Sequence, residues 1–580
     1  MSLPCPDTYE FGDFRLEADK RLLLRRGDPV ALTPKVFDTL LSLVQHQGKV
    51  IAKDDLMRAV WPDTVVEENN LNQNISILRR ALGENRRENR YIATVPGRGY
   101  HFIPAVEVLA GLARSNAGHV TVAVLPFHNL SADPDREYLA DGLTEEVIAT
   151  LGQIDPGRLS VIGRTTMMSY KRPKKTLAEI GRELDAAYLV ESSMRSERGR
   201  LRITSNLIRV PSQVQIWSMS YDSEPTSMLE FQREISAAIG QQVRLQLSPE
   251  RLSAIGRRQT RNTEAYDLYL RGRYFWNQLS PATAKRATEF FARATTLDPQ
   301  YALAWCGLAD AYTASPINGD APPLTVGPLA REAAAQAVNV DPGLAESQTS
   351  WGFVKFWLDW DWPAAAASLR RAVDLDPQYS LAHRLLGIVL AHMGRHEEAA
   401  KAARRARELD PLLAGHHALS SQIAFMARDY ASALQFAKAS ITIDPEFWIG
   451  YMQLGQAYEQ LGDADRALAA LTDAARLSGG NSKPVSLRGY IFAKTGRTQE
   501  GREVLDMLQA LASERYVPGY ALALIHAGLG QHEQALDWLG RAFEMRDVHL
   551  AFLANDVKWD PLRQDPRFIS LLKRCRFATS

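Results

Sequence analysis

The sequence has few cysteines, no long apolar run and no excess of charge of one sign. Its 580 residues include only three cysteines, too few for the disulfide framework of a small secreted protein. The best candidate for a membrane span, 105–113, is far shorter than the roughly 18 apolar residues required, and it contains Glu107. The amino terminus lacks a basic region followed by an apolar run, so no signal peptide is predicted. These absences predict a soluble, cytoplasmic chain with no membrane partner.

The near-zero net charge conceals an uneven distribution. Lysine and arginine total 68 and aspartate and glutamate total 67, which gives a formal net charge of +1. A nucleic-acid-binding protein usually presents a basic patch, which the total does not indicate. Residues 1–78 hold 9 basic and 12 acidic side chains, a balance of −3, whereas residues 79–98 hold 6 arginines and 2 glutamates, a balance of +4. The sequence therefore predicts a compact basic patch over 79–98.

Three regions of different pattern predict a multidomain protein. Residues 8–104 alternate strand-like and helix-like signals and predict an α+β domain. Residues 105–118 are small and weakly patterned, and we expect a linker there. Apolar runs of strand length alternate with helical stretches over 119–248, which predicts an α/β domain. From 262 to 575 the chain is alanine-rich, and we expect it to be entirely helical.

The first region has the order of elements of a winged helix–turn–helix. Short strands are predicted before residue 32, and Thr33-Pro34 can cap and open a helix. A second helix is predicted over Ala52–Trp61 and a longer third helix over Glu67–Leu82. Strands at 91–95 and 100–102 enclose a tight turn that carries an arginine between glycines.

The third helix and the hairpin carry side chains suited to DNA. Amides and arginines read base edges in the major groove, and an arginine at a hairpin tip suits the minor groove or the phosphates. Apolar residues recur at Leu71, Ile75, Leu78 and Leu82 and mark the opposite, core face. The predicted DNA contacts are Asn70, Gln73, Asn74, Ser76, Ile77, Arg79, Arg80, Arg86, Arg87, Thr94 and Arg98. Arg79 could instead pair with a carboxylate, and the loop containing Arg86 and Arg87 could simply be solvated.

The residues of this domain carry a family resemblance. The stretches Leu32–Leu40, Asn74–Leu82 and Thr94–Phe102 resemble the OmpR/PhoB-type winged-helix transcriptional regulators. The resemblance implies double-stranded DNA as partner and Arg98 as the contact of the wing. It also implies groove-facing positions at or near Gln73, Asn74, Ser76, Ile77 and Arg80. The family often has arginine or histidine where this chain has Ser76 and Ile77, so no base preference is implied.

The last region repeats. An aliphatic-Asp-Pro triplet recurs with aspartates at 298, 341, 376, 410 and 444, separated by 43, 35, 34 and 34 residues. A period of 34 residues resembles tetratricopeptide repeats, which are helix–turn–helix units, and about eight are predicted. The 43-residue step predicts an inserted loop over 314–328. Such solenoids usually bind a protein or peptide on their concave face.

The middle region is the least specific. Val120–Phe127 predicts a buried strand, and the segment around it resembles the TolB amino-terminal-like α/β domain. We find no catalytic residues to assign to it. Its role remains open between a packing module, an effector-binding module and a dimerising module, and a homodimer is likewise left open.

The function predicted is that of a soluble, sequence-specific DNA-binding transcriptional regulator. Its repeats would bind a protein, peptide or effector, or mediate oligomerisation. The layout resembles that of CadC/ToxR-type regulators without their membrane span, and is closer to HilA-type activators. No phosphate loop of the G-x-x-x-x-G-K-[ST] type and no H-E-x-x-H zinc motif is present, so no catalytic residue, cofactor or metal is predicted. The alternatives are an interaction scaffold with a vestigial winged helix and, less favoured, an enzyme or nucleotide sensor in 119–248.

Overall fold

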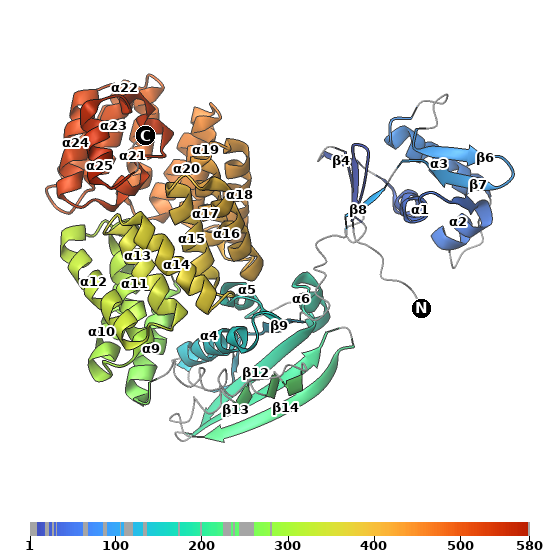
Figure 1. Ribbon diagram of the computed structural model, residues 1–580, viewed down its shortest axis with the longest axis horizontal. Coiled ribbons are helices and arrows are strands. Elements are labelled where there is room, and N and C mark those ends of the chain that lie inside the picture. The colour runs from blue at the N-terminus through green and yellow to red at the C-terminus, as the bar shows by residue number, and fades with distance from the viewer. Residues whose placement is uncertain are drawn as a thin grey trace. The chain divides into compact units, whose positions relative to one another are not determined.

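The computed structural model divides the chain into two units, residues 1–118 and residues 119–580 (Figure 1). The residues described are 8–17, 22–25, 28–30, 32–61, 66, 68–84, 90–104, 106–109, 120–131, 136–171, 175–197, 200–210, 212–223, 234–235, 238–239, 241–242, 260–278 and 281–577. No helix within these ranges combines the length and the hydropathy that crossing a membrane requires.

The first unit contains three helices and two antiparallel sheets. Its helices are α1 (Pro34–Gln45), α2 (Lys53–Val60) and α3 (Glu68–Ala81). One sheet has the order β4-β3-β2-β1-β8, from β1 (Thr8–Phe11), β2 (Phe14–Glu17), β3 (Leu22–Arg25), β4 (Asp28–Val30) and β8 (Glu107–Leu109). The other has the order β5-β7-β6, from β5 (Val50–Ala52), β6 (Ile92–Val95) and β7 (Gly99–Phe102). Helix, helix, longer helix and hairpin therefore follow one another in the predicted order.

Two strands of this unit were not predicted. The predicted linker contains β8, whose Leu109 lies opposite Thr8 of β1 in an antiparallel ladder. The second unpredicted strand, β5, pairs with β7 across Gly99. A Cβ atom at Gly99 would lie 1.8 Å from the carbonyl oxygen of Ile51, so only glycine allows these strands to approach. Both strands have three residues, too few to show an alternating pattern.

The start of α1 also differs in detail from the prediction. Thr33 occupies the position before the helix, but its side chain makes no capping hydrogen bond. The proline at the first helical position remains, and it suits that place because its missing N–H would have no partner there. The helix start was therefore predicted from a proline signal and not from a formed cap.

The second unit begins with a mixed sheet. Its order is β11-β9-β12-β13-β14, with β10 pairing with β12. The strands are β9 (Val120–Val124), β10 (His128–Asn129), β11 (Leu159–Val161), β12 (Tyr188–Glu197), β13 (Arg200–Arg209) and β14 (Val214–Ser223). The helices are α4 (Glu137–Ile154), α5 (Arg164–Met168) and α6 (Leu177–Glu183). Strands β9, β11 and β12 run parallel, whereas β13 and β14 return antiparallel.

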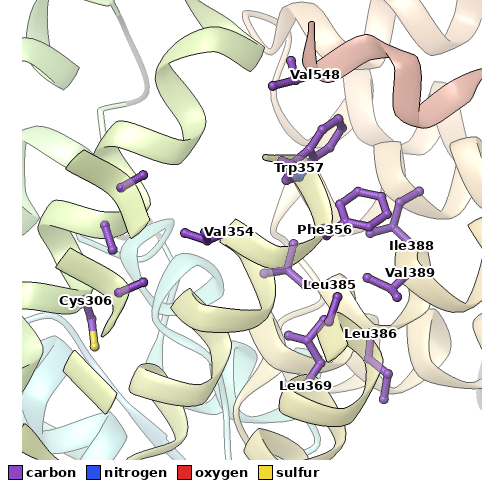
Figure 2. Close-up of a cluster of buried hydrophobic side chains, with 14 of the residues drawn as sticks. Cys306, Val354, Phe356, Trp357, Leu369, Leu385, Leu386, Ile388, Val389 and Val548 are labelled. Carbon is purple, nitrogen blue, oxygen red and sulfur yellow. The ribbon is translucent and has the colours of Figure 1, made fainter. Parts of the chain in front are cut away.

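The remainder of the unit is a helical solenoid (Figure 1). Its helix pairs are α9 (Thr263–Trp276) with α10 (Pro281–Leu297), α11 (Ala302–Asn318) with α12 (Pro323–Val340), α13 (Ala345–Trp357) with α14 (Trp362–Leu375), α15 (Ser380–His392) with α16 (His396–Leu409), α17 (Ala414–Met426) with α18 (Tyr430–Ile443), α19 (Trp448–Gln460) with α20 (Ala464–Leu477), α21 (Ser482–Lys494) with α22 (Thr498–Leu511) and α23 (Gly519–Gly528) with α24 (His532–Glu544). Two short 3-10 helices, η3 (Val548–Phe552) and η4 (Val557–Leu562), and helix α25 (Pro566–Arg574) follow. Figure 2 shows part of the apolar core.

The predicted inserted loop at 314–328 is wrong. Helix α11 continues through Pro316 to Asn318, and α12 begins at Pro323, so only 319–322 connects them. The extra residues of the 43-residue step therefore lengthen the two helices. Proline misled the prediction because it is also tolerated in the first turn of a helix, as Pro323 is here.

The Asp-Pro triplets mark the turns between helix pairs. The carboxylate of Asp298 accepts a hydrogen bond from the N–H of Gln300 at 2.9 Å, and Asp444 accepts one from Glu446 at 2.9 Å. This local bond favours the turn over a further helical residue. The triplet therefore recurs because each second helix must stop at the same place.

Asp410 departs from this pattern and joins the sheet region to the solenoid. Its carboxylate accepts hydrogen bonds from the Thr166 N–H at 2.8 Å and the Thr166 hydroxyl at 2.6 Å, at the start of α5. Gln378, in the preceding repeat turn, accepts a hydrogen bond from the N–H of Val161 at 2.9 Å and donates to the carbonyl of Leu159. Two repeat turns therefore hold the parallel edge of the sheet.

A buried ion pair strengthens the same junction. Glu145 of α4 pairs with Arg273 of α9, and its second oxygen lies 3.1 Å from Nε of Arg164. Burial raises the pKa of the Glu145 carboxyl, but the two guanidiniums outweigh it and hold the pKa below its ordinary value. Apolar side chains of the sheet region and of the repeats also belong to one continuous core. The middle region is thus packed onto the solenoid.

Candidate nucleic-acid interface

Helix α3 separates a core face from an exposed polar face. Leu71 and Leu78 are fully buried and Ile75 is 2% exposed, all in the core of the first unit. Because successive residues are about 100° apart around a helix, polar residues between them lie on the opposite side. The exposed residues of this face are Asn70, Gln73, Ser76, Ile77 and Arg80. The core thus fixes the helix while this face stays open.

Asn74 does not lie on that face, which corrects the prediction. Its side chain is 8% exposed, and its amide donates to the carbonyl of Lys35 at 3.1 Å and to the hydroxyl of Thr39 at 3.0 Å. Both acceptors belong to α1. Position 74 follows Leu71 by three residues and precedes Leu78 by four, which is the spacing of the core stripe. Asn74 therefore positions α3 against α1.

Arg79 is engaged within the domain. Its guanidinium donates to the hydroxyl of Thr94 at 2.8 Å and to the carbonyl of Ile92 at 3.0 Å, both on β6. Its Nε lies 3.7 Å from a carboxylate oxygen of Glu84. Glu84 in turn accepts the N–H groups of Tyr91 and Ile92. Arg79 and Thr94 thus tie the end of α3 to the hairpin, and Glu84 is the carboxylate partner considered as the alternative for Arg79.

Arg98 stands in the turn between β6 and β7. Its side chain is exposed, and its backbone N–H donates to the carbonyl of Val95 at 3.0 Å. Gly97 beside it has a φ of +70°, a conformation that glycine adopts at little cost. The turn therefore presents the guanidinium at the tip of the hairpin.

Two acidic side chains of the first unit are paired with basic ones. Glu68, at the start of α3, pairs with Lys53 of α2, and this hydrogen bond raises the pKa of Lys53. Glu84 is buried beside Arg79. Within the described part of the chain, neither Arg80 nor Arg98 has an ion-pair partner. The exposed face of α3 and the hairpin tip are therefore electropositive, which favours an anionic ligand.

Four further side chains on α3 or following it in the sequence are relevant to the predicted interface. Arg86 and Arg87 lie outside the described residues. Asn69 is exposed four residues before Gln73 and could have been found from that helical spacing. Arg90 is exposed, with its guanidinium 5.4 Å from the centre of the Tyr91 ring.

Searched over the described ranges, the chain has no group of three or more histidine, cysteine, aspartate or glutamate side chains arranged to hold a metal ion. The site is therefore described by its amides, hydroxyls and guanidiniums alone.

Comparison with known families agrees with this geometry. Residues 27–102 match the family described as transcriptional regulatory protein, C terminal. Residues 361–414 and 452–516 match a tetratricopeptide repeat family. The chain thus contains an OmpR/PhoB-type winged-helix domain and tetratricopeptide repeats, and the sheet of strands β9 to β14 lies between them in the sequence. The resemblance of 119–248 to the TolB amino-terminal-like domain stays a prediction.

Individual relatives include proteins described as transcriptional regulators. The transcriptional regulator HilA of Salmonella typhi is 27% identical over 308 residues, which cover 52% of this chain and 53% of HilA. The putative adenylate cyclase 3 of Rhizobium meliloti is 31% identical over 189 residues, 33% of this chain and 32% of that protein. The solved DNA-binding domain of Escherichia coli CadC is 30% identical, with a TM-score of 0.17, over 18% of this chain and 99% of that one. The chain thus spans about half the length of HilA and a third of the cyclase.

Proposed function

We propose that this protein is a sequence-specific regulator of transcription that binds double-stranded DNA through α3 and the β6–β7 hairpin. The observation that carries the proposal is the exposed face of α3. It presents amides and a guanidinium that has no ion-pair partner among the described residues, on a helix whose opposite face is held in the core. Asn70 and Gln73 have the amides that bind adenine in the major groove, and Arg80 has the guanidinium that binds guanine or phosphate. Arg98 would contact the minor groove or the backbone.

The second unit would carry the regulatory input. Tetratricopeptide repeats usually bind protein segments, so we infer a protein or peptide partner or a second copy of the chain. One α3 helix contacts one half-site, and the basic patch is small. Stable occupancy of DNA at physiological salt would therefore require a dimer or a bound partner.

Replacing the two exposed arginines tests the proposal. On a duplex selected by the full chain, Arg80→Ala is expected to weaken binding by about 1–3 kcal/mol, or roughly 5- to 150-fold. Arg98→Ala should reduce the slope of log K against log salt by about 1, because one phosphate contact is lost. Fluorescence anisotropy at several salt concentrations measures both quantities.

Arg476 provides a matched control. It is an exposed arginine of the solenoid, whose guanidinium lies 3.0 Å from Asp473. Arg476→Ala should leave DNA affinity unchanged. If Arg80→Ala and Arg98→Ala behave like this control, the DNA-binding proposal fails and the scaffold interpretation is favoured.

The enzymatic alternative rests on a relative's name. The relative described as a putative adenylate cyclase shares 189 aligned residues with this chain, whereas HilA, described as a transcriptional regulator, shares 308. We therefore infer a non-enzymatic regulator. Incubating the full chain with ATP and measuring cyclic nucleotide would overturn that inference if product accumulated above the blank.

A further inference from the structure

The first helices of several repeat pairs are buried around most of their surface, unlike the second helices. In α15 every residue from Leu385 to His392 is buried, and in α23 every residue from Gly519 to His526 is buried. In α16, by contrast, the buried positions recur only every three or four residues, as on a helix with one solvent face. The first helices line the concave groove of such a solenoid. Because their groove-facing residues are buried, another part of the chain must cover the groove.

The segment that covers it is Val548–Arg563 of the same chain, here called the groove segment. It contains η3 and η4 and touches first helices of many repeats. Helix η3 contacts the first helices α11 and α13 and also the second helix α24, and η4 contacts the first helix α23. Figure 2 shows Val548 of η3 near Trp357 of α13. The apolar side chains of the segment that are at most 3% exposed are Val548, Leu550, Ala551, Leu553, Trp559 and Leu562.

An aromatic anchor of the groove segment joins three repeats. The ring centre of Phe552 lies 5.8 Å from that of Trp357 on α13 and 5.4 Å from that of His392 on α15. The Nζ atom of Lys483, on α21, lies 3.6 Å from the centre of the same ring. The arrangement over three separate helices is that of a ligand side chain in a pocket, with a cation over the ring face.

Polar contacts fix the other end of the groove segment. Nζ of Lys558 donates to Oε1 of Gln456 on α19 at 3.1 Å and lies 4.8 Å from the ring centre of Phe425 on α17. The indole N–H of Trp559 donates to the hydroxyl of Tyr520 on α23 at 3.1 Å. Lys558 is only 3% exposed, and its charge is paired with Asp556 of the groove segment itself at 3.1 Å.

The groove itself has a polar lining. Gln453 and Gln456 are each 4% exposed, and Gln453 donates to Gln422 of α17 at 2.7 Å. Buried amides of this kind require hydrogen-bonding partners, and Lys558 supplies one. A groove that only buried apolar surface would not need amides in its lining. A groove that recognises a peptide uses a few such polar groups to fix the peptide's orientation.

We propose that the groove segment is the solenoid's own ligand and that it excludes external peptides from the concave face. A protein partner would then bind the outer surface, made largely of second helices and turns, or would first have to displace the groove segment. The inference goes beyond DNA binding and does not depend on it. A chain that failed to bind DNA could still have an occupied groove.

The test uses a fluorescently labelled synthetic peptide of residues 547–563 and the full chain. The wild-type chain is expected to show no saturable binding up to about 100 μM, because the groove is filled. Full-length Trp559→Ala, in which the native segment is weakened, should bind the peptide at least 10-fold more tightly. Trp538→Ala serves as the matched control, because Trp538 lies on the second helix α24, where its ring faces Arg541. A peptide of scrambled sequence should bind none of the three chains.

Two results would overturn the proposal. One is equal binding of the peptide to wild type and to Trp559→Ala, which would mean that the groove is open. The other is a folded Trp559→Ala chain that does not bind the peptide, which would make the segment ordinary core.

If Trp559→Ala does not fold, hydrogen exchange on the wild-type chain decides. Backbone amides of the groove segment that bond within it, such as Leu553 N–H to Leu550 O at 3.2 Å, should exchange as slowly as those of α19. Rapid exchange of these amides in an otherwise protected solenoid would contradict an occupied groove.

Discussion

Helices α3 and α19 both carry amides, but only one of them presents these amides to solvent. On α3, Asn70 and Gln73 are exposed beside an arginine without an ion-pair partner among the described residues. On α19, Gln453 and Gln456 are buried, and Gln456 accepts a hydrogen bond from Lys558 of the groove segment. Amide side chains therefore occur on a helix of each unit, but only the structure shows whether they are exposed or covered by another part of the chain.

The contrast assigns different tasks to the two units. The first unit keeps a polar face open by fixing the helix from its other side. The second unit combines a sheet region, a solenoid and a groove segment in one continuous core. A ligand of the first unit can bind without rearrangement, whereas a ligand of the groove would have to compete with a covalently attached one.

The largest effect is expected from cutting the link between the sheet region and the solenoid. Asp410→Ala would leave the N–H of Thr166 and its neighbour without an acceptor in a buried place, which should destabilise the second unit by about 2–4 kcal/mol. Tryptophan fluorescence during urea unfolding measures this, since Trp61 is the only tryptophan of residues 1–118. DNA affinity should not change if the two units act separately.

Asp444 offers a control within the same repeated triplet. Its carboxylate makes only a local turn bond, to the N–H of Glu446, so Asp444→Ala should cost about 1 kcal/mol or less. Equal losses for Asp410→Ala and Asp444→Ala would show that the sheet region is not held by the repeat turns.

A smaller effect separates positioning from contact in the first unit. Arg79→Met removes the bonds from α3 to β6 and should destabilise the first unit by about 1–2 kcal/mol. DNA binding should weaken with no change in its salt slope, because no phosphate contact is removed. If the salt slope fell as it should for Arg98→Ala, Arg79 would be a direct contact.

A pH dependence is expected in the second unit from one buried histidine, His392. Burial lowers the pKa of His392 to about 4, with a further lowering by the nearby charge of Lys483, although the bond to the Ile388 carbonyl opposes it. An unfolded histidine takes up a proton below about 6.5, whereas folded His392 stays neutral until about 4. The wild-type chain should therefore lose stability relative to His392→Asn as the pH falls from 6.5 to 4.

Unfolding in urea at a series of pH values checks this. The exposed His46 serves as the control, because His46→Asn changes a histidine in the first unit. A difference between wild type and His392→Asn that did not vary over this pH range would mean that His392 is not held neutral.

Much of the architecture could be predicted because it depends on the spacing of residues close together in the sequence. The Asp-Pro triplet recurs wherever a second helix must stop, and the core stripe of α3 follows from Leu71, Ile75 and Leu78. The site was predicted less well. Asn74 also occupies a position of the core stripe. Its amide suggested a contact with DNA, whereas its hydrogen-bond partners in the structure lie on α1.

What could not be predicted depends on contacts between distant residues. Phe552 contacts Trp357 and Lys483, from which it is separated by many helices in the sequence, and no local sequence pattern predicts these contacts. The same holds for Asp410, which repeats the local motif yet bonds to Thr166 of another region. The sequence could not decide whether Arg79 contacts DNA or a partner within the domain. Its hydrogen-bond partner Thr94 is separated from it by a loop, so no helical spacing relates the two.

Selection from a pool of random double-stranded DNA by the full chain tests the central claim most directly. Enrichment of one motif is expected, and a chain carrying Arg80→Ala should select a motif relaxed at one base pair while the others are kept. Retention of DNA with no enriched sequence, or an identical motif from both chains, would contradict sequence reading by the exposed face of α3.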